Sequence, residues 1–128
     1  MKIFEHEIRV SEEDIDNLNH VNNVRYLQWI QDIAEAHWLS VAPKEMQAQC
    51  MWVVLRHEID YLNAALLGDT LKVKTWVGKS EGVKSERHVE ITNLASGKLA
   101  CAAKTTWCLL DAATKRPKRV QGVVDVFV

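Results

Sequence analysis

The hydrophobic pattern of the chain changes its period once, and this change limits the possible folds. Between Val24 and Pro43 the apolar side chains recur at helical spacing, at Leu27, Ile30, Ile33, Ala34 and Trp38. We therefore predict one long amphipathic helix that ends before Pro43, because the residue preceding a proline avoids helical geometry. After a connecting loop the period becomes two, which predicts strands at residues 52–62, 70–79, 83–94 and 98–110.

Short turns separate these four segments and predict antiparallel neighbours. They are Leu67-Gly68-Asp69, Ser80-Glu81-Gly82 and Ala95-Ser96-Gly97. Residues 3–10 also alternate and add a half-buried strand before the helix. The segment 99–110 is apolar or small on both faces, as a central strand would be. We predict an α+β fold in which one long helix is wrapped by a curved antiparallel sheet of about five strands.

One helix covers only one face of such a sheet, so the other face needs a second cover. Trp76, Trp107 and many valines are available to form that second apolar surface. Association of subunits is therefore expected.

Length and charge limit the classes of function. A chain of 128 residues is too short for two well-formed cores, so residues 1–128 are expected to form a single domain. The 16 Lys and Arg against 17 Asp and Glu give a net charge of −1, so no overall field selects nucleic acid or an anionic membrane. The charged N-terminal segment and the lack of a long apolar run predict a cytoplasmic protein without membrane insertion.

The three cysteines, Cys50, Cys101 and Cys108, match no metal-binding spacing. Small, reduced core residues are the expected state of all three. An odd separation along one strand would turn Cys101 and Cys108 to opposite faces, which argues against a shared disulfide or metal site. We predict neither a metal nor a cofactor.

The residues just before the predicted helix form the candidate site. Between Asp14 and Tyr26 the chain packs acids, amides and an imidazole into one short stretch. The first turn of a helix has backbone N–H groups without internal partners and the positive end of the helix dipole, which together suit an oxyanion. An N–H near Asn23 would polarise the carbonyl of an acyl thioester, while Asp16 attacks that carbonyl or activates a water.

The same stretch also allows a purely structural interpretation. Asp16, Asn19 and Asn22 are residue types that cap loops and helix starts without any chemistry. His20 beside a turn fits either a hydrogen-bonding, packing role or a catalytic one. The residues taken alone leave these alternatives open.

The motif Asp16-x-x-x-His20-Val21-Asn22-Asn23-x-x-Tyr26-Leu27 resembles a pattern of the 4-hydroxybenzoyl-CoA thioesterase-like branch of the hotdog-fold thioesterases. The resemblance spans nearly the whole chain and includes two further stretches, Glu58-Ile59-Asp60-Tyr61 and the segment from Asp111 to Pro117. It implies a hotdog fold, a homodimer or homotetramer, and acyl-CoA or acyl-ACP thioesters as substrates. It also implies that Asp16 is the catalytic aspartate, that Asn23 polarises the carbonyl, and that His20 and Asn22 are site residues.

The chain departs from the related plant acyl-ACP enzymes at one position. Those enzymes place an asparagine two residues after the aspartate, where this chain has Leu18 and has Asn19 one place later. Their complete Asp-Asn-His chemistry therefore does not transfer. Glu58 is a candidate for a further acid, although strand alternation would put Glu58 and His57 on opposite faces of the sheet.

Other residues are candidates for substrate binding. Lys115 and Arg116 belong to a basic run that would hold the phosphates of CoA, or would simply be solvated. Tyr26 would line the acyl pocket, or would belong to the helix core. The acyl group, and the choice between nucleophile and general base for Asp16, stay open.

Two competing functions use the same fold. The first is a non-catalytic domain that binds or senses acyl thioesters. The second, ranked last, is a dehydratase acting on hydroxyacyl thioesters, which needs a differently placed histidine with an acid partner. Hydrolysis of acyl thioesters is the function that the sequence favours.

Overall fold

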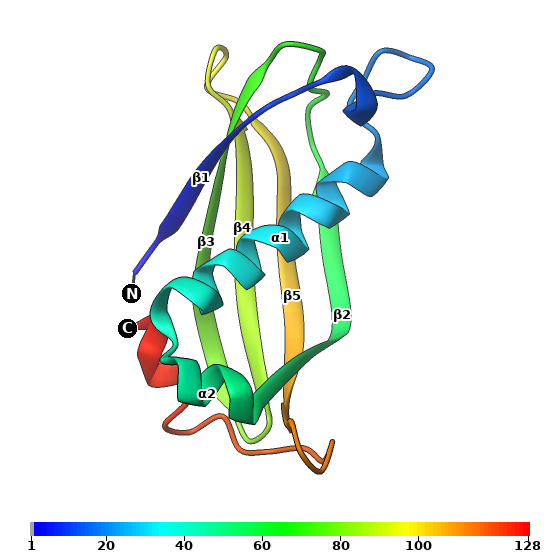
Figure 1. The fold of residues 1–128 in the computed structure, drawn as a ribbon. Helices are drawn as coiled ribbons and strands as arrows, with labels where there is room; N and C mark the ends of the chain where they lie inside the picture. The colour runs from blue at the N-terminus through cyan, green and yellow to red at the C-terminus, as the bar shows by residue number, and fades with distance from the viewer. Residues whose placement is uncertain (1) are drawn as a thin grey trace.

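The computed structural model describes residues 2–128 and contains one long helix and a five-stranded sheet (Figure 1). In chain order the elements are β1 (Phe4–Arg9), the 3-10 turn η1 (Glu12–Asp14), α1 (Asn23–Val41), α2 (Lys44–Gln49), β2 (Cys50–Tyr61), β3 (Thr70–Glu81), β4 (Lys84–Asn93), β5 (Leu99–Asp111) and the 3-10 turn η2 (Val124–Phe127). The predicted long helix and the predicted strands are confirmed, with ends shifted by about two residues at most.

The strands form one antiparallel sheet in the order β1-β3-β4-β5-β2. The predicted hairpins β3–β4 and β4–β5 are confirmed, and β5 is an interior strand, between β4 and β2. The predicted pairing across residues 67–69 is wrong, because β2 pairs with β5 instead of β3. The connection after β2 docks on the N-terminal segment, where Gly68 N–H donates to the Val10 carbonyl and Val21 N–H donates to the Ala65 carbonyl. These bonds carry the chain to the β1 side of the sheet, where β3 begins.

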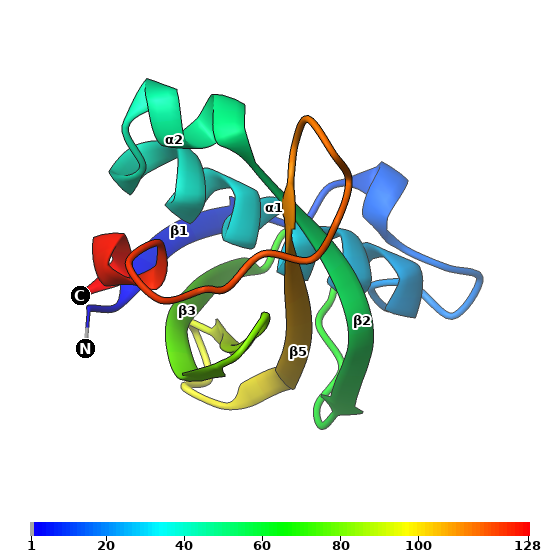
Figure 2. The same ribbon diagram turned by 90° about the horizontal axis from the view of Figure 1, so that it is seen from below.

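Helix α1 lies against the concave face of the sheet, which curves around it (Figure 2). It begins where Asn22 caps the Val24 N–H, and it ends at Val41, two residues before Pro43, as predicted. Its apolar stripe joins the sheet in a core that includes Ile30, Leu71, Val73, Val89 and Ile91. None of the helices within residues 2–128 is long and apolar enough to cross a membrane.

The prediction of a loop after Pro43 is wrong, because residues 44–49 form the short helix α2. The sequence Lys-Glu-Met-Gln-Ala-Gln consists of good helix formers, so a separate short helix begins directly after the break at Pro43, which is its N-cap. The Gln47 side chain donates to the Ala42 carbonyl at 2.9 Å and joins α2 to the end of α1.

The two tryptophans expected on the uncovered face lie on opposite faces. Trp76 is on the outer face, where its ring stacks on His88 at 5.4 Å. The expectation for Trp107 is wrong, because residue 107 has the same strand parity as the buried residues Ala103 and Thr105. Trp107 therefore faces the side of the sheet that α1 covers.

All three cysteines are free and buried, as expected. Burial raises the pKa of the Cys101 thiol to about 12, so this side chain is a neutral thiol at pH 7. Cys101 and Cys108 thus behave as small core residues of β5.

Candidate active site

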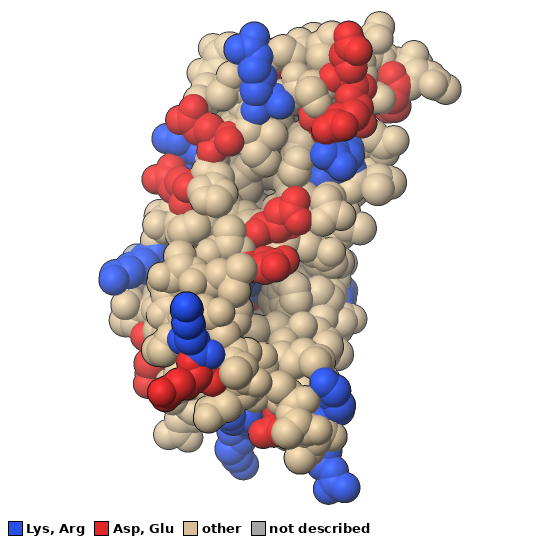
Figure 3. Space-filling model, viewed as in Figure 1, with Lys and Arg blue, Asp and Glu red and all other residues tan. Residues whose placement is uncertain are grey.

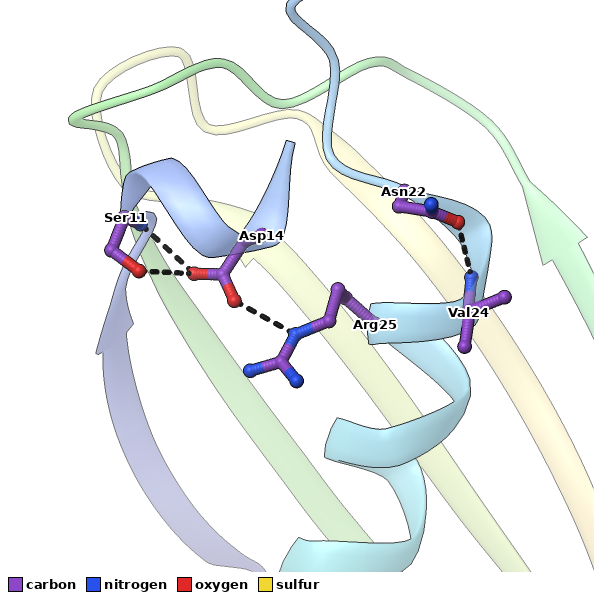
Figure 4. Close-up of polar contacts among 5 residues, drawn as sticks. All are labelled: Ser11, Asp14, Asn22, Val24 and Arg25. Atoms are coloured by element: carbon purple, nitrogen blue, oxygen red, sulfur yellow. Dashed lines mark hydrogen bonds and ion pairs between the residues drawn. The ribbon is translucent and has the colours of Figure 1, made fainter. Parts of the chain in front are cut away.

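A buried carboxylate fixes the segment that leads into α1. Asp14 is 3% exposed and accepts hydrogen bonds from the Ser11 backbone N–H at 2.9 Å and the Ser11 hydroxyl at 3.1 Å. Its other oxygen accepts from Arg25 Nε at 2.8 Å (Figure 4). The Asp14 carbonyl also accepts from the Asn22 N–H at 2.8 Å. Asp14 therefore holds the end of β1 and the start of α1 together.

Asp16, two residues later, shapes a tight loop. Its Oδ1 atom accepts from the Leu18 N–H at 2.9 Å and from the His20 N–H at 3.2 Å. The Asp16 N–H donates to the His20 carbonyl at 2.8 Å, and Asn19 takes a positive φ of 64°, which asparagine tolerates well. The Oδ2 atom accepts no hydrogen bond within the described chain. One oxygen of Asp16 is structural, and the other is free for a ligand or a proton.

The first turn of α1 supplies backbone donors. Asn22 is the N-cap, and its Oδ1 atom accepts from the Val24 N–H at 3.0 Å (Figure 4). Asn23 is the first helical residue and is exposed. Its own N–H donates to no acceptor among residues 2–128, as expected for the start of a helix. An acyl oxygen placed here would meet this donor and the positive end of the helix dipole.

Backbone pairing holds Asp16 and Asn23 in one unit. Ile15 pairs with Val21 in an antiparallel bridge, which closes the loop of residues 15–21 directly before the helix. A second bridge joins His20 to Leu66 in the connection after β2. The arrangement presents a partly free carboxylate and a free N–H on the same surface segment.

Apolar side chains surround this loop at the surface. Leu18 is 72% exposed and Val24 is 68% exposed, and the neighbouring connection after β2 adds the exposed residues Leu62, Leu66 and Leu67. Acidic side chains also gather at this end of the molecule (Figure 3). An exposed apolar patch of this kind indicates a binding surface for a ligand or another subunit.

His20 is exposed at the candidate site, whereas Tyr26 is buried in the core. His20 belongs to the Asp16 loop, and its side chain is exposed. Tyr26 packs in the core, edge-on to Trp29 with the ring centroids 5.6 Å apart. Burial raises the pKa of Tyr26 to about 12. His20 therefore lies in the candidate site, whereas Tyr26 supports it from beneath the first turn of α1.

Glu58, Lys115 and Arg116 are not brought to Asp16 within one chain. Glu58 lies on the outer face of the sheet and forms ion pairs with Arg56 at 3.5 Å and Lys104 at 3.3 Å. His57 lies on the inner face, where its ring contacts Gln31 of α1, so the predicted opposition of these neighbours is confirmed.

Lys115 and Arg116 are exposed in the turn after β5, at the end of the sheet opposite the Asp16 loop (Figure 1). The Lys115 N–H donates to the Asp111 carbonyl, and the Asp111 N–H donates to the Arg116 carbonyl. Since β5 has 13 residues, the two ends of the sheet are roughly 40 Å apart.

Two polar features of the structure, the bond between Asp14 and Arg25 and the buried Arg87, were not predicted from the sequence. The bond between Asp14 and Arg25 had a weak signal, because the spacing from Ser11 to Asp14 matches a capping box. The burial of Arg87 also had a weak signal in the sequence, because residue 87 occupies an inward position of an alternating strand. Neither signal identifies the partner, since the partner comes from another element.

Comparisons with known proteins identify the family of the chain. The family model described as the thioesterase-like superfamily matches residues 10–127. The chain belongs to this superfamily. Members of the superfamily with similar sequences include the long-chain acyl-CoA thioesterase FadM of Escherichia coli, 26% identical over 91% of this chain and 89% of that protein.

A plant relative and a solved structure extend the comparison. The chloroplastic acyl-[acyl-carrier-protein] hydrolase FATB3 of Cuphea viscosissima is 28% identical over 67% of this chain and 22% of that protein. The chain thus spans about a fifth of the length of the plant relatives it matches. The probable thioesterase YbaW of Escherichia coli superposes with a TM-score of 0.83 at 23% identity, covering 95% of this chain and 94% of that one. The hotdog fold expected from the sequence is therefore confirmed.

Proposed function

We propose that this superfamily member hydrolyses acyl-CoA or acyl-ACP thioesters to a free acid and a thiol. The observation that carries the proposal is the hydrogen-bonded loop that holds Asp16 directly before the free N–H of Asn23. This pairing of a carboxylate with an oxyanion donor is what attack on a thioester carbonyl requires.

The chemistry needs only a few groups. The Asn23 N–H donates a hydrogen bond to the carbonyl oxygen as negative charge develops on that oxygen, and such a donor contributes about 3 kcal/mol. Asp16 either takes the proton from an attacking water or attacks the carbonyl itself to form an anhydride that water then cleaves. In the water route, a C–O bond to water replaces the C–S bond, and Asp16 passes the proton it took from water to the departing thiolate. In the anhydride route, the thiolate leaves as the C–O bond to Asp16 forms and takes a proton from solvent; water then cleaves the anhydride, which releases the acid and restores the Asp16 carboxylate. His20 and Asn22 position this loop.

A second copy of the chain completes the site in this proposal. Among residues 2–128, one edge of β2 is unpaired; Leu55 and Tyr61 of β2 are exposed, as is Leu62 directly after the strand. A long exposed edge strand is a template for pairing. Antiparallel pairing of two β2 edges would place the Cys50 end of one copy beside the Tyr61 end of the other.

The turn that carries Lys115 and Arg116 also has a role in this dimer. Tyr61 lies next to the start of α1, where its hydroxyl donates to the Asn23 carbonyl at 3.5 Å. The turn carrying Lys115 and Arg116 lies at the Cys50 end, and Ala112 N–H donates to the Gln49 carbonyl. In the dimer these cations would reach the Asp16 loop of the partner and bind the phosphates of CoA. Free, buried cysteines suit a reducing compartment, and we place the activity in the cytoplasm.

The test is thiol release from short, long and aromatic acyl-CoA substrates by the native protein and Asp16→Asn. An asparagine Oδ1 can still accept from the Leu18 and His20 N–H groups, so this variant keeps the loop and loses only the charge. We expect kcat/KM to fall by about 100-fold or more. Asp32→Asn is the matched control, since Asp32 is an exposed carboxylate on α1, and it should keep native activity.

A thioester-binding domain without catalysis is the second candidate. It is favoured by the structural use of Asp16 Oδ1, which caps two backbone N–H groups of its own loop. Binding of acyl-CoA without thiol release by the native protein would replace the hydrolase with this candidate. Activity of Asp16→Asn within about threefold of native would remove the Asp16 carboxylate from the mechanism.

A further inference from the structure

A cavity of about 530 Å³ lies between the C-terminal half of α1 and the inner face of the sheet. This volume is in the usual range for small-molecule pockets, about 300–1,000 Å³. Its walls are mainly apolar and aromatic, with Trp38, Trp52, Val54, Trp107 and Phe127 among the lining residues. The cavity does not include Asp16, so it is separate from the loop that carries the proposed chemistry.

One buried cation lies in the wall of this cavity. Arg87 of β4 is 5% exposed, and its guanidinium lies 4.9 Å from the centre of the Phe127 ring. Its Nη1 atom donates to His37 Nδ1 at 2.9 Å and to Thr75 Oγ1 at 3.0 Å. Burial, and then the charge of Arg87, lower the pKa of His37 to about 4, so His37 is a neutral acceptor. Burial lowers the pKa of Arg87 only to about 10, so the guanidinium is charged at pH 7.

No carboxylate compensates this charge within residues 2–128. Arg87 forms no ion pair there, and Glu35, which also lines the cavity, makes none with it. Only Nη1 is engaged, so Nε and Nη2 are available as donors. Buried charges are normally paired, and an unpaired one in a cavity wall indicates a ligand of opposite charge.

The same wall has other donors without acceptors. The indole Nε1 atoms of Trp52 and Trp107 are buried and have no hydrogen-bond partner in the described chain. They are two of only three such side-chain atoms, and the third is the hydroxyl of Tyr26, which does not line this cavity. An indole N–H can only donate. Because both indole nitrogens are fully buried, the free Arg87 N–H groups are the donors that a ligand in the cavity would meet, and a group that only accepts hydrogen bonds suits them.

We propose that this cavity binds the far end of the acyl group and that Arg87 selects acyl groups ending in a carboxylate. A carboxylate supplies acceptor oxygens and the opposite charge, and its geometry matches the two free guanidinium nitrogens. The apolar walls take the methylene chain. The inference rests on the proposed thioester substrate, and it specifies the class of acyl group.

The dimer described above gives the acyl group a path to this cavity. Cys50, Trp52, Val53 and Val54 of the first half of β2 line the cavity, and that half would lie beside the partner's Asp16 loop. Within one chain, the lining residues of α1 run from Gln31 to Trp38, about 12 to 22 Å along the helix from Asn23. In the dimer, an acyl group whose carbonyl binds the Asn23 N–H of one copy would thus extend into the cavity of the other copy.

The test compares dissociation constants of matched thioesters, measured by calorimetry on the native protein and on Asp16→Asn. The pairs are hexanedioyl-CoA with hexanoyl-CoA and decanedioyl-CoA with decanoyl-CoA, which differ only in the terminal carboxylate. We expect the dicarboxylic member of at least one pair to bind about 10- to 100-fold more tightly, as one charge-assisted contact provides. Equal dissociation constants in both pairs, or failure of every thioester to bind, overturn the proposal.

Variants of Arg87 test whether this side chain causes the preference for dicarboxylic thioesters. Arg87→Met removes the charge at similar volume and should abolish the preference, while Arg87→Lys should keep part of it. Thermal unfolding of each variant checks that the fold survives. A preference that persists in folded Arg87→Met contradicts the assignment.

Thiol release, measured separately, distinguishes the two proposals. Selective binding without release removes the hydrolase and keeps the role of Arg87. Release without selectivity keeps the hydrolase and removes that role.

Discussion

Replacing Asp14 with alanine tests whether a buried carboxylate holds the candidate site in place. The change removes three side-chain hydrogen bonds, two from Ser11 and one from Arg25 Nε. The backbone bond from the Asn22 N–H to the Asp14 carbonyl survives. The experiment therefore isolates the contribution of the side chain.

The expected loss of stability follows from the exposure of the partners. Breaking a fully buried ion pair costs about 3–5 kcal/mol, because the remaining charge stays without compensation. The Arg25 side chain is 36% exposed, so water can solvate its charge after the change. Ser11 is exposed as well, so its donors are also hydrated. We therefore expect a loss of about 2–3 kcal/mol in the free energy of unfolding.

Urea unfolding followed by circular dichroism measures this loss. Asp32→Ala is the matched control, because Asp32 is an exposed carboxylate with one surface partner, and its loss should be within about 0.5 kcal/mol. Arg25→Ala, alone and combined with Asp14→Ala, gives the coupling energy of the pair. Thiol release below the transition temperature then shows whether the loosened helix start also lowers activity.

The reasoning is refuted if Asp14→Ala is no less stable than Asp32→Ala. A coupling energy near zero would separately show that Arg25 is not the partner that matters. In either case the loop of residues 15–21 would have to be held by its own hydrogen bonds.

Three further perturbations have expected outcomes. Asn22→Ala removes the cap of α1 and should cost about 1 kcal/mol in urea unfolding; no loss would contradict the role of the cap. Leu109→Ala opens a cavity at a fully buried position and should cost about 2–5 kcal/mol, against a small effect for the exposed Leu39→Ala. The pKa of His37, lowered to about 4 from 6.5, means that the unfolded chain binds this proton more readily; stability is therefore full above pH 6.5 and falls toward pH 4. His37→Gln should flatten this fall in unfolding free energies measured at pH 7 and pH 4.5, and an unchanged slope would refute the assignment.

Much of the candidate site could be read from the sequence, because it is local. Asp16, His20, Asn22 and Asn23 lie within one short stretch, so the loop and the helix start bring them together without help from distant elements. The resemblance to the thioesterases rested on the same stretch. Glu58, by contrast, lies on the outer face with Lys104, which sequence spacing does not reveal.

The sequence by itself determined the long helix, the five strands and the fold class. Periodicity reflects which side of each element is buried, and this depends on neighbours along the chain. The same local rule predicted that His57 and Glu58 would lie on opposite faces.

Only the tertiary structure decided the strand order, the inward position of Trp107 and the isolation of Arg87 in the wall of a cavity. Each depends on contacts between residues far apart in the chain, such as the pairing of β2 with β5 in place of β3. Such contacts are selected by the packing of the whole molecule, since the local patterns of β2 and β3 are compatible with either pairing.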